Sequence, residues 1–132
     1  MLTWIFAVLV LFVLQTWLPV TLGLLGSKSL SASFVRFLGG RDKKLPTNKM
    51  SKRSARALKN MQEAIPVFLA LGMISLIQGE EVAAASQRGA AIFFVARVLY
   101  IPAYLSGILG LRTTIWLIGW VGLILMAWPL FG

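Results

Sequence analysis

The sequence predicts an all-α membrane protein whose single domain, residues 1–132, is a bundle of four transmembrane helices. The chain is 58% hydrophobic and only 13% charged, and its mean hydropathy is +0.84. A soluble domain contains about 25% charged residues, so this composition indicates an integral membrane protein. Four apolar stretches are long enough to cross the hydrocarbon core of a bilayer. We expect the spans at about 2–26, 52–78, 89–109 and 113–131.

The first span contains no charged side chain, and Gln15, Thr16 and Thr21 are polar. It could be mistaken for a secretory signal peptide. However, it lacks a basic segment at its start and its apolar stretch is too long, so we expect it to be a retained span. Pro19 lies inside this span and is expected to kink it.

The segment 27–51 is predicted to be a polar, basic loop, because it contains turn-forming sequences around Gly39-Gly40 and Pro46. The second helix is expected to begin near Ser51 or Lys52, where serine can cap it. A short connector then leads to the third span, and Arg112 lies between the third and fourth spans.

The net charge of +9 is concentrated in one part of the chain, since ten of the thirteen basic residues lie between Lys28 and Lys59. A basic block beside membrane spans is typical of a cytoplasmic loop that contacts lipid headgroups. We therefore expect the 27–51 loop to be cytoplasmic and both termini to be non-cytoplasmic, and Arg112 agrees with this orientation. The aromatic residues lie in the spans and do not alternate with the bases, so no nucleic-acid partner is expected.

The chain contains neither cysteine nor histidine. This excludes disulfides and a cysteine nucleophile, and it removes the usual general base and the commonest metal ligand. The only acids are Asp42, Glu63, Glu80 and Glu81. So few carboxylates disfavour both a two-carboxylate mechanism and a metal site, and we expect no metal.

The start of the second span has a polar stripe of four residues at helical spacing, namely Arg53, Arg56, Asn60 and Glu63. On a helix these four positions fall within an arc of about 80°. Such a face is costly in a membrane unless it contacts protein or water. The stripe therefore indicates either a polar site or a polar joint between helices near one membrane surface.

The third span has a second polar stripe, formed by Arg97, Tyr100 and Tyr104 within an arc of about 60°. Arg97 lies fifteen residues before Arg112, or roughly 22 Å deeper along a helix, and a buried guanidinium there needs a partner. Glu63 is the only acid inside a span, so we predict a Glu63–Arg97 ion pair. The structural alternative is that both stripes form a polar seam that only fixes helix register.

Residues 53–68 have the form R-x-x-R-A-x-x-N-x-x-E-x-x-P-x-F. This pattern resembles the second-helix signature of the MAPEG family, the membrane-associated proteins in eicosanoid and glutathione metabolism. Residues 38–42 resemble the first loop of bacterial members. The third and fourth helices of these bacterial members also have counterparts here, namely residues 97–104, 111–112 and Trp116. The resemblance extends over essentially the whole chain.

This resemblance implies a homotrimer of four-helix subunits that binds glutathione between neighbouring subunits near the cytoplasmic side. The implied glutathione-binding residues are Arg53, Arg56, Asn60 and Glu63 from one subunit, with Tyr100 and Tyr104 from its neighbour. Arg112 matches the arginine that is thought to stabilise the glutathione thiolate in the family. Which tyrosine makes which contact stays open, because the spacing to Arg112 differs by one residue from some animal enzymes.

The function implied is a glutathione-dependent transferase or peroxidase of a bacterial inner membrane, acting on lipophilic electrophiles that arrive through the lipid. Glutathione brings its own sulfur nucleophile, so the missing cysteine and histidine are no obstacle. The alternative is a non-catalytic protein of the same fold, acting as a scaffold, a lipid-binding protein or an accessory subunit of a larger membrane complex. A small multidrug transporter is disfavoured, because such proteins need an acid in the first span.

Overall fold

The computed structural model describes residues 1–27, 31, 34–35, 38–39 and 47–131, so most of the expected basic loop lies outside the described residues. The long helices of this part are α1 (Leu2–Leu25), α3 (Lys49–Ile77), α4 (Glu80–Ser106) and α5 (Leu109–Ala127), and a short 3-10 helix, η1 (Trp128–Leu130), follows them. Each of the four long helices is long and apolar enough to span a membrane. The expected fold class is thereby confirmed.

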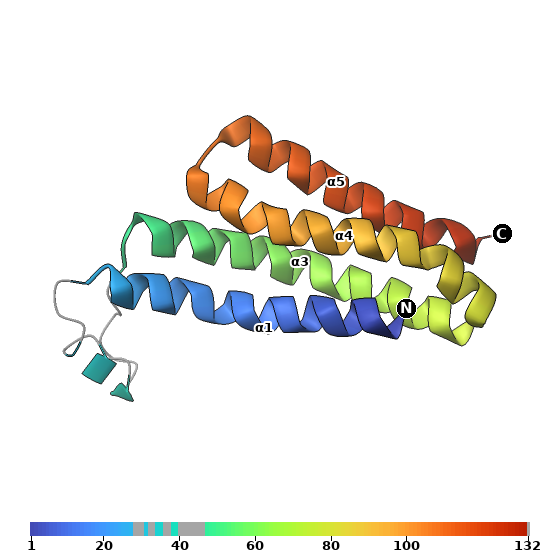
Figure 1. Ribbon diagram of the computed structural model, residues 1–132, viewed down its shortest axis with the longest axis horizontal. Coiled ribbons are helices and arrows are strands. Elements are labelled where there is room, and N and C mark those ends of the chain that lie inside the picture. Colours follow the sequence, from blue (N-terminus) through green and yellow to red (C-terminus); the bar gives the residue numbers. More distant parts are fainter. Residues whose placement is uncertain (28–30, 32–33, 36–37, 40–46, 132) are drawn as a thin grey trace.

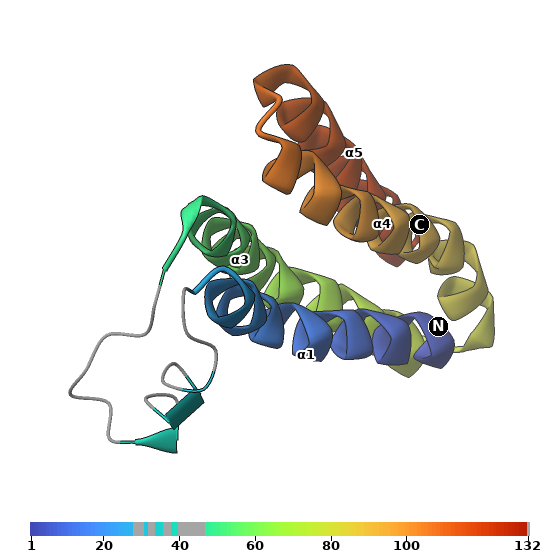
Figure 2. The same cartoon turned by 60° about the vertical axis from the view of Figure 1, so that its left-hand side comes forward.

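Neighbouring helices lie side by side in the order α1, α3, α4 and α5, and both ends of the chain lie at the same end of the bundle (Figure 1). The most extensive packing is between α4 and α5, and α3 packs about as much against α4 as against α1; we refer to α1 with α3 and α4 with α5 as the two pairs. Figure 2 shows that the two pairs come together at the turn between α3 and α4 and diverge toward the opposite end. The polar stripe of α3 lies near that opposite end, where α3 begins.

The start of α3 is attached to the end of α1 by two polar side chains. Asn48 caps the helix, because its side-chain oxygen accepts a hydrogen bond from the Ser51 backbone N–H at 2.7 Å, and its Nδ2 donates to the Leu22 carbonyl at 2.7 Å. Ser51 Oγ donates to the Pro19 carbonyl at 2.8 Å. The helix therefore begins at Lys49, three residues before the expected boundary at 52, and Asn48 rather than Ser51 caps it.

The helix α4 begins at Glu80, nine residues before the expected start of the third span at 89. Gly79 makes the turn from α3 with a φ of 115°, which L side chains rarely adopt. Glu80 and Glu81 then occupy the first turn, where their negative charges interact favourably with the helix dipole. The segment expected to connect the second and third spans is thus part of α4. It forms the first turns of this helix, although it is less apolar than the span itself.

The apolar core occupies the half of the bundle away from the start of α3. Phe68 of α3 stacks on Phe93 of α4 with ring centroids 4.7 Å apart, and both side chains are fully buried. In the same core, Val8 of α1 and Met126 of α5 are also fully buried. Since helix association inside a bilayer depends on close packing, this cluster holds the helices together next to the polar residues.

The helices α4 and α5 approach closely through small residues. A Cβ placed on Gly89 would lie 2.5 Å from the Met126 nitrogen, and one placed on Gly122 would lie 2.7 Å from the Phe93 nitrogen. Ser86 Oγ also donates to the Met126 carbonyl at 3.1 Å. Contacts of this kind between backbones bind two membrane helices into a single unit.

Candidate functional site

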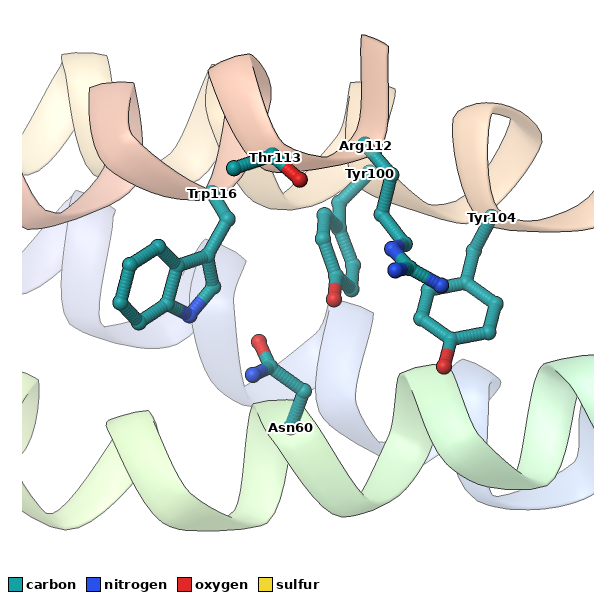
Figure 3. A pocket seen from close by; sticks show the side chains of 6 residues that line it. All are labelled: Asn60, Tyr100, Tyr104, Arg112, Thr113 and Trp116. Atoms are coloured by element: carbon teal, nitrogen blue, oxygen red, sulfur yellow. The ribbon is translucent and has the colours of Figure 1, made fainter. Parts of the chain in front are cut away.

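Polar side chains from α3, α4 and α5 line two adjacent pockets in the half of the bundle where α3 begins. The first pocket has a volume of about 280 Å³ and is lined by Asn60, Tyr100, Tyr104, Arg112, Thr113 and Trp116 (Figure 3). The second has a volume of about 310 Å³ and is lined by Arg56, Lys59, Asn60, Glu63, Tyr100 and Tyr104. Because they share an asparagine and two tyrosines, we treat them as one region and call it the polar cleft.

One wall of the polar cleft is made by Tyr100 and Tyr104 of α4 with Arg112 of α5. The two tyrosine rings meet edge to face with centroids 5.4 Å apart, and Arg112 Cζ lies 5.0 Å from the centre of the Tyr104 ring. Figure 3 shows both phenol groups pointing toward α3, with Arg112 reaching down beside them. Among the described residues Arg112 has no hydrogen bond or ion pair through its side chain, so its N–H groups can donate to a ligand.

The opposite wall comes from α3, where Arg97 of α4 fixes the orientation of Asn60. Arg97 Nη1 donates to Asn60 Oδ1 at 2.5 Å, and Arg97 is only 3% exposed. Its guanidinium also lies over the rings of Phe93 at 4.9 Å and Tyr100 at 5.8 Å. With its oxygen occupied by Arg97, Asn60 offers its Nδ2 group to a ligand as a donor.

The expected partner of Arg97 was Glu63, but the described residues show no salt bridge between these two side chains, and Asn60 is bonded to Arg97 instead. Asn60 and Glu63 are one helical turn apart on the same face of α3, so a small axial shift between α3 and α4 decides which one Arg97 meets. Glu63 is exposed and lines the second pocket. Its carboxylate is therefore open to a ligand.

Arg97 is accommodated because α5 has a glycine opposite it. A Cβ on Gly119 would lie 3.6 Å from Arg97 Nη2, and a larger side chain would enter the space that the guanidinium occupies. Two nitrogens of Arg97, Nε and Nη2, are buried and have no partner in the described part of the chain. A buried cation in this position makes the electrostatic potential of the cleft more positive and favours an anionic ligand.

The four residues of the α3 stripe are not all in the polar cleft. Arg56, Asn60 and Glu63 line it, whereas Arg53 lines neither pocket. Arg53 Nη1 donates instead to the carbonyl of Leu105 near the end of α4, at 2.6 Å. The stripe therefore divides into three cleft residues and one arginine that contacts the end of a neighbouring helix.

Three residues of the cleft were not expected from the sequence, namely Lys59, Thr113 and Trp116. Helical spacing could have indicated two of them. Lys59 lies three residues after Arg56, and Trp116 lies four residues after Arg112, so each shares a helix face with an expected site residue.

An apolar pocket lies between α4 and α5, with a volume of about 310 Å³. Its lining residues are Ala91, Ile92, Val95, Ala96, Leu99, Ile115 and Ile118. Leu99 and Ile115 directly adjoin the cleft residues Tyr100 and Trp116 in the sequence, so the apolar pocket lies beside the polar cleft on a neighbouring face of these helices.

The part of the chain that the structure describes has four helices able to span a membrane, and α3, α4 and α5 line a cationic cleft that contains two tyrosines; these features define a multi-pass membrane protein with a polar site between its helices. The chain belongs to the MAPEG family, whose model matches residues 3–132. This confirms the resemblance carried by residues 53–68. Comparison with curated proteins and with solved structures gives no match.

Proposed function

We propose that the protein is a membrane-bound glutathione-dependent transferase or peroxidase that acts on lipophilic electrophiles, with Arg112 stabilising the glutathione thiolate. The observation that carries the proposal is the position of the Arg112 guanidinium, which lies in the cleft beside two tyrosines and has N–H donors available. The MAPEG family includes glutathione transferases and peroxidases, and this supports the same assignment.

The charges of the polar cleft complement those of glutathione, which has two carboxylates and one ammonium group. Arg56 and Lys59 line the second pocket and provide cations for the carboxylates, and an arginine binds a carboxylate through two parallel hydrogen bonds. Glu63, in the same pocket, provides an acceptor for the ammonium group. The Nδ2 group of Asn60 donates to a carboxylate or a peptide carbonyl of the ligand.

The chemistry begins with loss of the thiol proton of glutathione to water. A guanidinium beside the sulfur favours the thiolate, and the hydroxyls of Tyr100 and Tyr104 provide hydrogen bonds to it. In a transferase reaction the thiolate forms a C–S bond to the electrophile, and the leaving group departs with its electron pair. In a peroxidase reaction the thiolate takes the terminal oxygen of a hydroperoxide and releases the alcohol. A second glutathione then yields the disulfide and water.

We propose further that the protein is a homotrimer in a bacterial inner membrane, with the 27–51 loop cytoplasmic and both termini non-cytoplasmic. In this arrangement the polar cleft lies near the cytoplasmic surface. Asn60, Tyr100, Tyr104 and Arg112 line one pocket within a single chain, so a neighbouring subunit would complete the open side. The apolar pocket between α4 and α5 offers the lipophilic co-substrate a place to bind beside the thiolate.

A second candidate function is non-catalytic binding of a lipid, as a scaffold or an accessory subunit of a larger complex. The apolar pocket favours it, because a hydrocarbon chain placed there would bring a lipid headgroup beside the polar cleft. In that case the cationic cleft would bind an anionic headgroup and no thiol.

The deciding experiment follows the ultraviolet thiolate band after purified protein is mixed with glutathione. We expect a band with the unmodified protein and with Arg88→Ala, a matched control because Arg88 is exposed near the opposite end of α4. We expect no band with Arg112→Ala, and a parallel loss of glutathione turnover with an aryl halide. A band of equal size in Arg112→Ala would contradict the assignment of Arg112. No band and no turnover with the unmodified protein would favour the lipid-binding function.

A further inference from the structure

The turn between α4 and α5 is short, and it connects two residues of the polar cleft. The last turn of α4 contains Tyr104, and the helix is followed by its C-cap residue Gly107, which is left-handed with a φ of 79°. Ile108 follows directly, and its carbonyl accepts a hydrogen bond from the Arg112 backbone N–H at 3.2 Å. The path of this turn therefore determines where Arg112 lies relative to Tyr104.

This turn is in contact with Arg53 of α3. The guanidinium donates from Nη1 to the Leu105 carbonyl at 2.6 Å. A Cβ placed on Gly107 would lie 2.6 Å from Arg53 Cζ and 2.7 Å from Nη1, so a side chain at this position would have to displace the guanidinium. Gly107 is thus favoured by its backbone conformation, and a side chain there would also disturb the contact that Arg53 makes.

The chemistry of this contact is that of a helix C-terminus. The last carbonyls of a helix have no partner within the helix and carry a partial negative charge. An arginine supplies both a donor for such a carbonyl and a positive charge beside it, and this makes the hydrogen bond stronger than a neutral one. Arg53 is half-buried, so water competes less for its guanidinium than at a fully exposed site.

We propose that Arg53 is a positioning residue, which holds the α4–α5 turn against α3 and so fixes Arg112 and the tyrosines relative to Asn60. Arg53 and Asn60 lie seven residues apart on α3 and so on the same face of the helix. One helix therefore contacts the turn through Arg53 and forms a cleft wall through Asn60. On this view Arg53 does not bind the glutathione carboxylate. The inference rests on the proposed function for the role of Arg112 only.

The first test uses protein stability and needs no ligand. Arg53→Ala and Gly107→Ala are each expected to lower the melting temperature, and Lys52→Ala, at the exposed neighbouring position, is not. Because the new Cβ collides with the guanidinium, Gly107→Ala is expected to cost less in the Arg53→Ala background than in the unmodified protein. Additive effects of the two substitutions would overturn the contact between Arg53 and the turn. Arg53→Lys, which keeps the cation, is expected to recover part of the stability.

The second test separates positioning from ligand binding. Arg53→Met is expected to raise the pH at which half of the bound glutathione is thiolate, because Arg112 is displaced. It is also expected to weaken binding of glutathione and of its two monoethyl esters, one for each carboxylate, by the same factor. If the loss vanishes for one ester, Arg53 binds that carboxylate directly and the proposal is overturned. If the unmodified protein forms no thiolate, the proposed function fails, while the contact is still decided by the stability test.

Discussion

Replacing Asn60 by aspartate separates two roles that this side chain combines. Its oxygen accepts a hydrogen bond from Arg97 Nη1 at 2.5 Å, and its nitrogen is left to donate within the polar cleft that Asn60 lines. Aspartate keeps an oxygen for Arg97 and adds the attraction of a full negative charge to this buried cation, which otherwise has only a neutral partner. We therefore expect Asn60→Asp to have a melting temperature equal to or above that of the unmodified protein.

The same substitution removes the N–H donor from the polar cleft and adds a negative charge facing the ligand. A hydrogen bond to a charged group contributes about 1.5–3 kcal/mol, so the dissociation constant for glutathione should rise by about 10- to 150-fold. Titration of the thiolate band measures this change, and a thermal melt in the same detergent measures stability.

The control is Asn60→Leu, which removes both groups. Arg97 then loses its only hydrogen bond among the described residues, and an unpaired buried donor costs about 1–3 kcal/mol. Asn60→Leu should therefore lower both stability and affinity. If Asn60→Asp instead destabilises as much as Asn60→Leu, or binds glutathione as tightly as the unmodified protein, the assigned orientation of the amide is wrong.

Three further predictions concern the bundle and its cleft. Gln15 Oε1 is buried without a partner in the described structure, so Gln15→Leu should leave the melting temperature unchanged or raise it; a fall would reveal a partner. Gly89→Leu should strongly lower the melting temperature, because the new side chain would push α4 away from α5. Gly110→Ala should not, since Gly110 faces open space, and equal melting temperatures of the two variants would refute the contact at Gly89. Because Trp116 lines the polar cleft, Trp116→Ala should raise the KM for glutathione and leave the melting temperature unchanged. An unchanged KM would mean that glutathione binds elsewhere.

The hydropathy of the sequence is enough to predict the four helices, because an apolar stretch of about twenty residues has few alternatives in a membrane. It does not predict where a helix begins outside the lipid. The first turns of α4 are helical from Glu80 onward but are too polar to be recognised as part of a span. At the start of α3, Asn48 and Ser51 are both good capping residues, and only the position of α1 decides between them.

Helical spacing placed Asn60 in one polar stripe and Tyr100 and Tyr104 in another, and the structure brings these three side chains together within one chain, whereas the family resemblance implied that they come from neighbouring subunits. Spacing identifies the face of a helix on which a residue lies, but not how far two helices are shifted along each other. Because of this shift, Arg97 donates a hydrogen bond to Asn60 and not to Glu63. For the same reason Arg53 donates to a carbonyl at the end of α4. Long arginine side chains make such choices especially hard to predict, because several acceptors lie within their reach.

The two pairs of helices are linked differently at the two ends of the bundle. Glycine contacts join α4 to α5, and Asn48 and Ser51 join α3 to α1. The pairs are linked covalently by the Gly79 turn, at the end where they come together in Figure 2. The Arg53–Leu105 hydrogen bond links α3 to α4 at the opposite end, where the pairs diverge and the polar cleft lies, so it fastens the bundle at the place farthest from the covalent link.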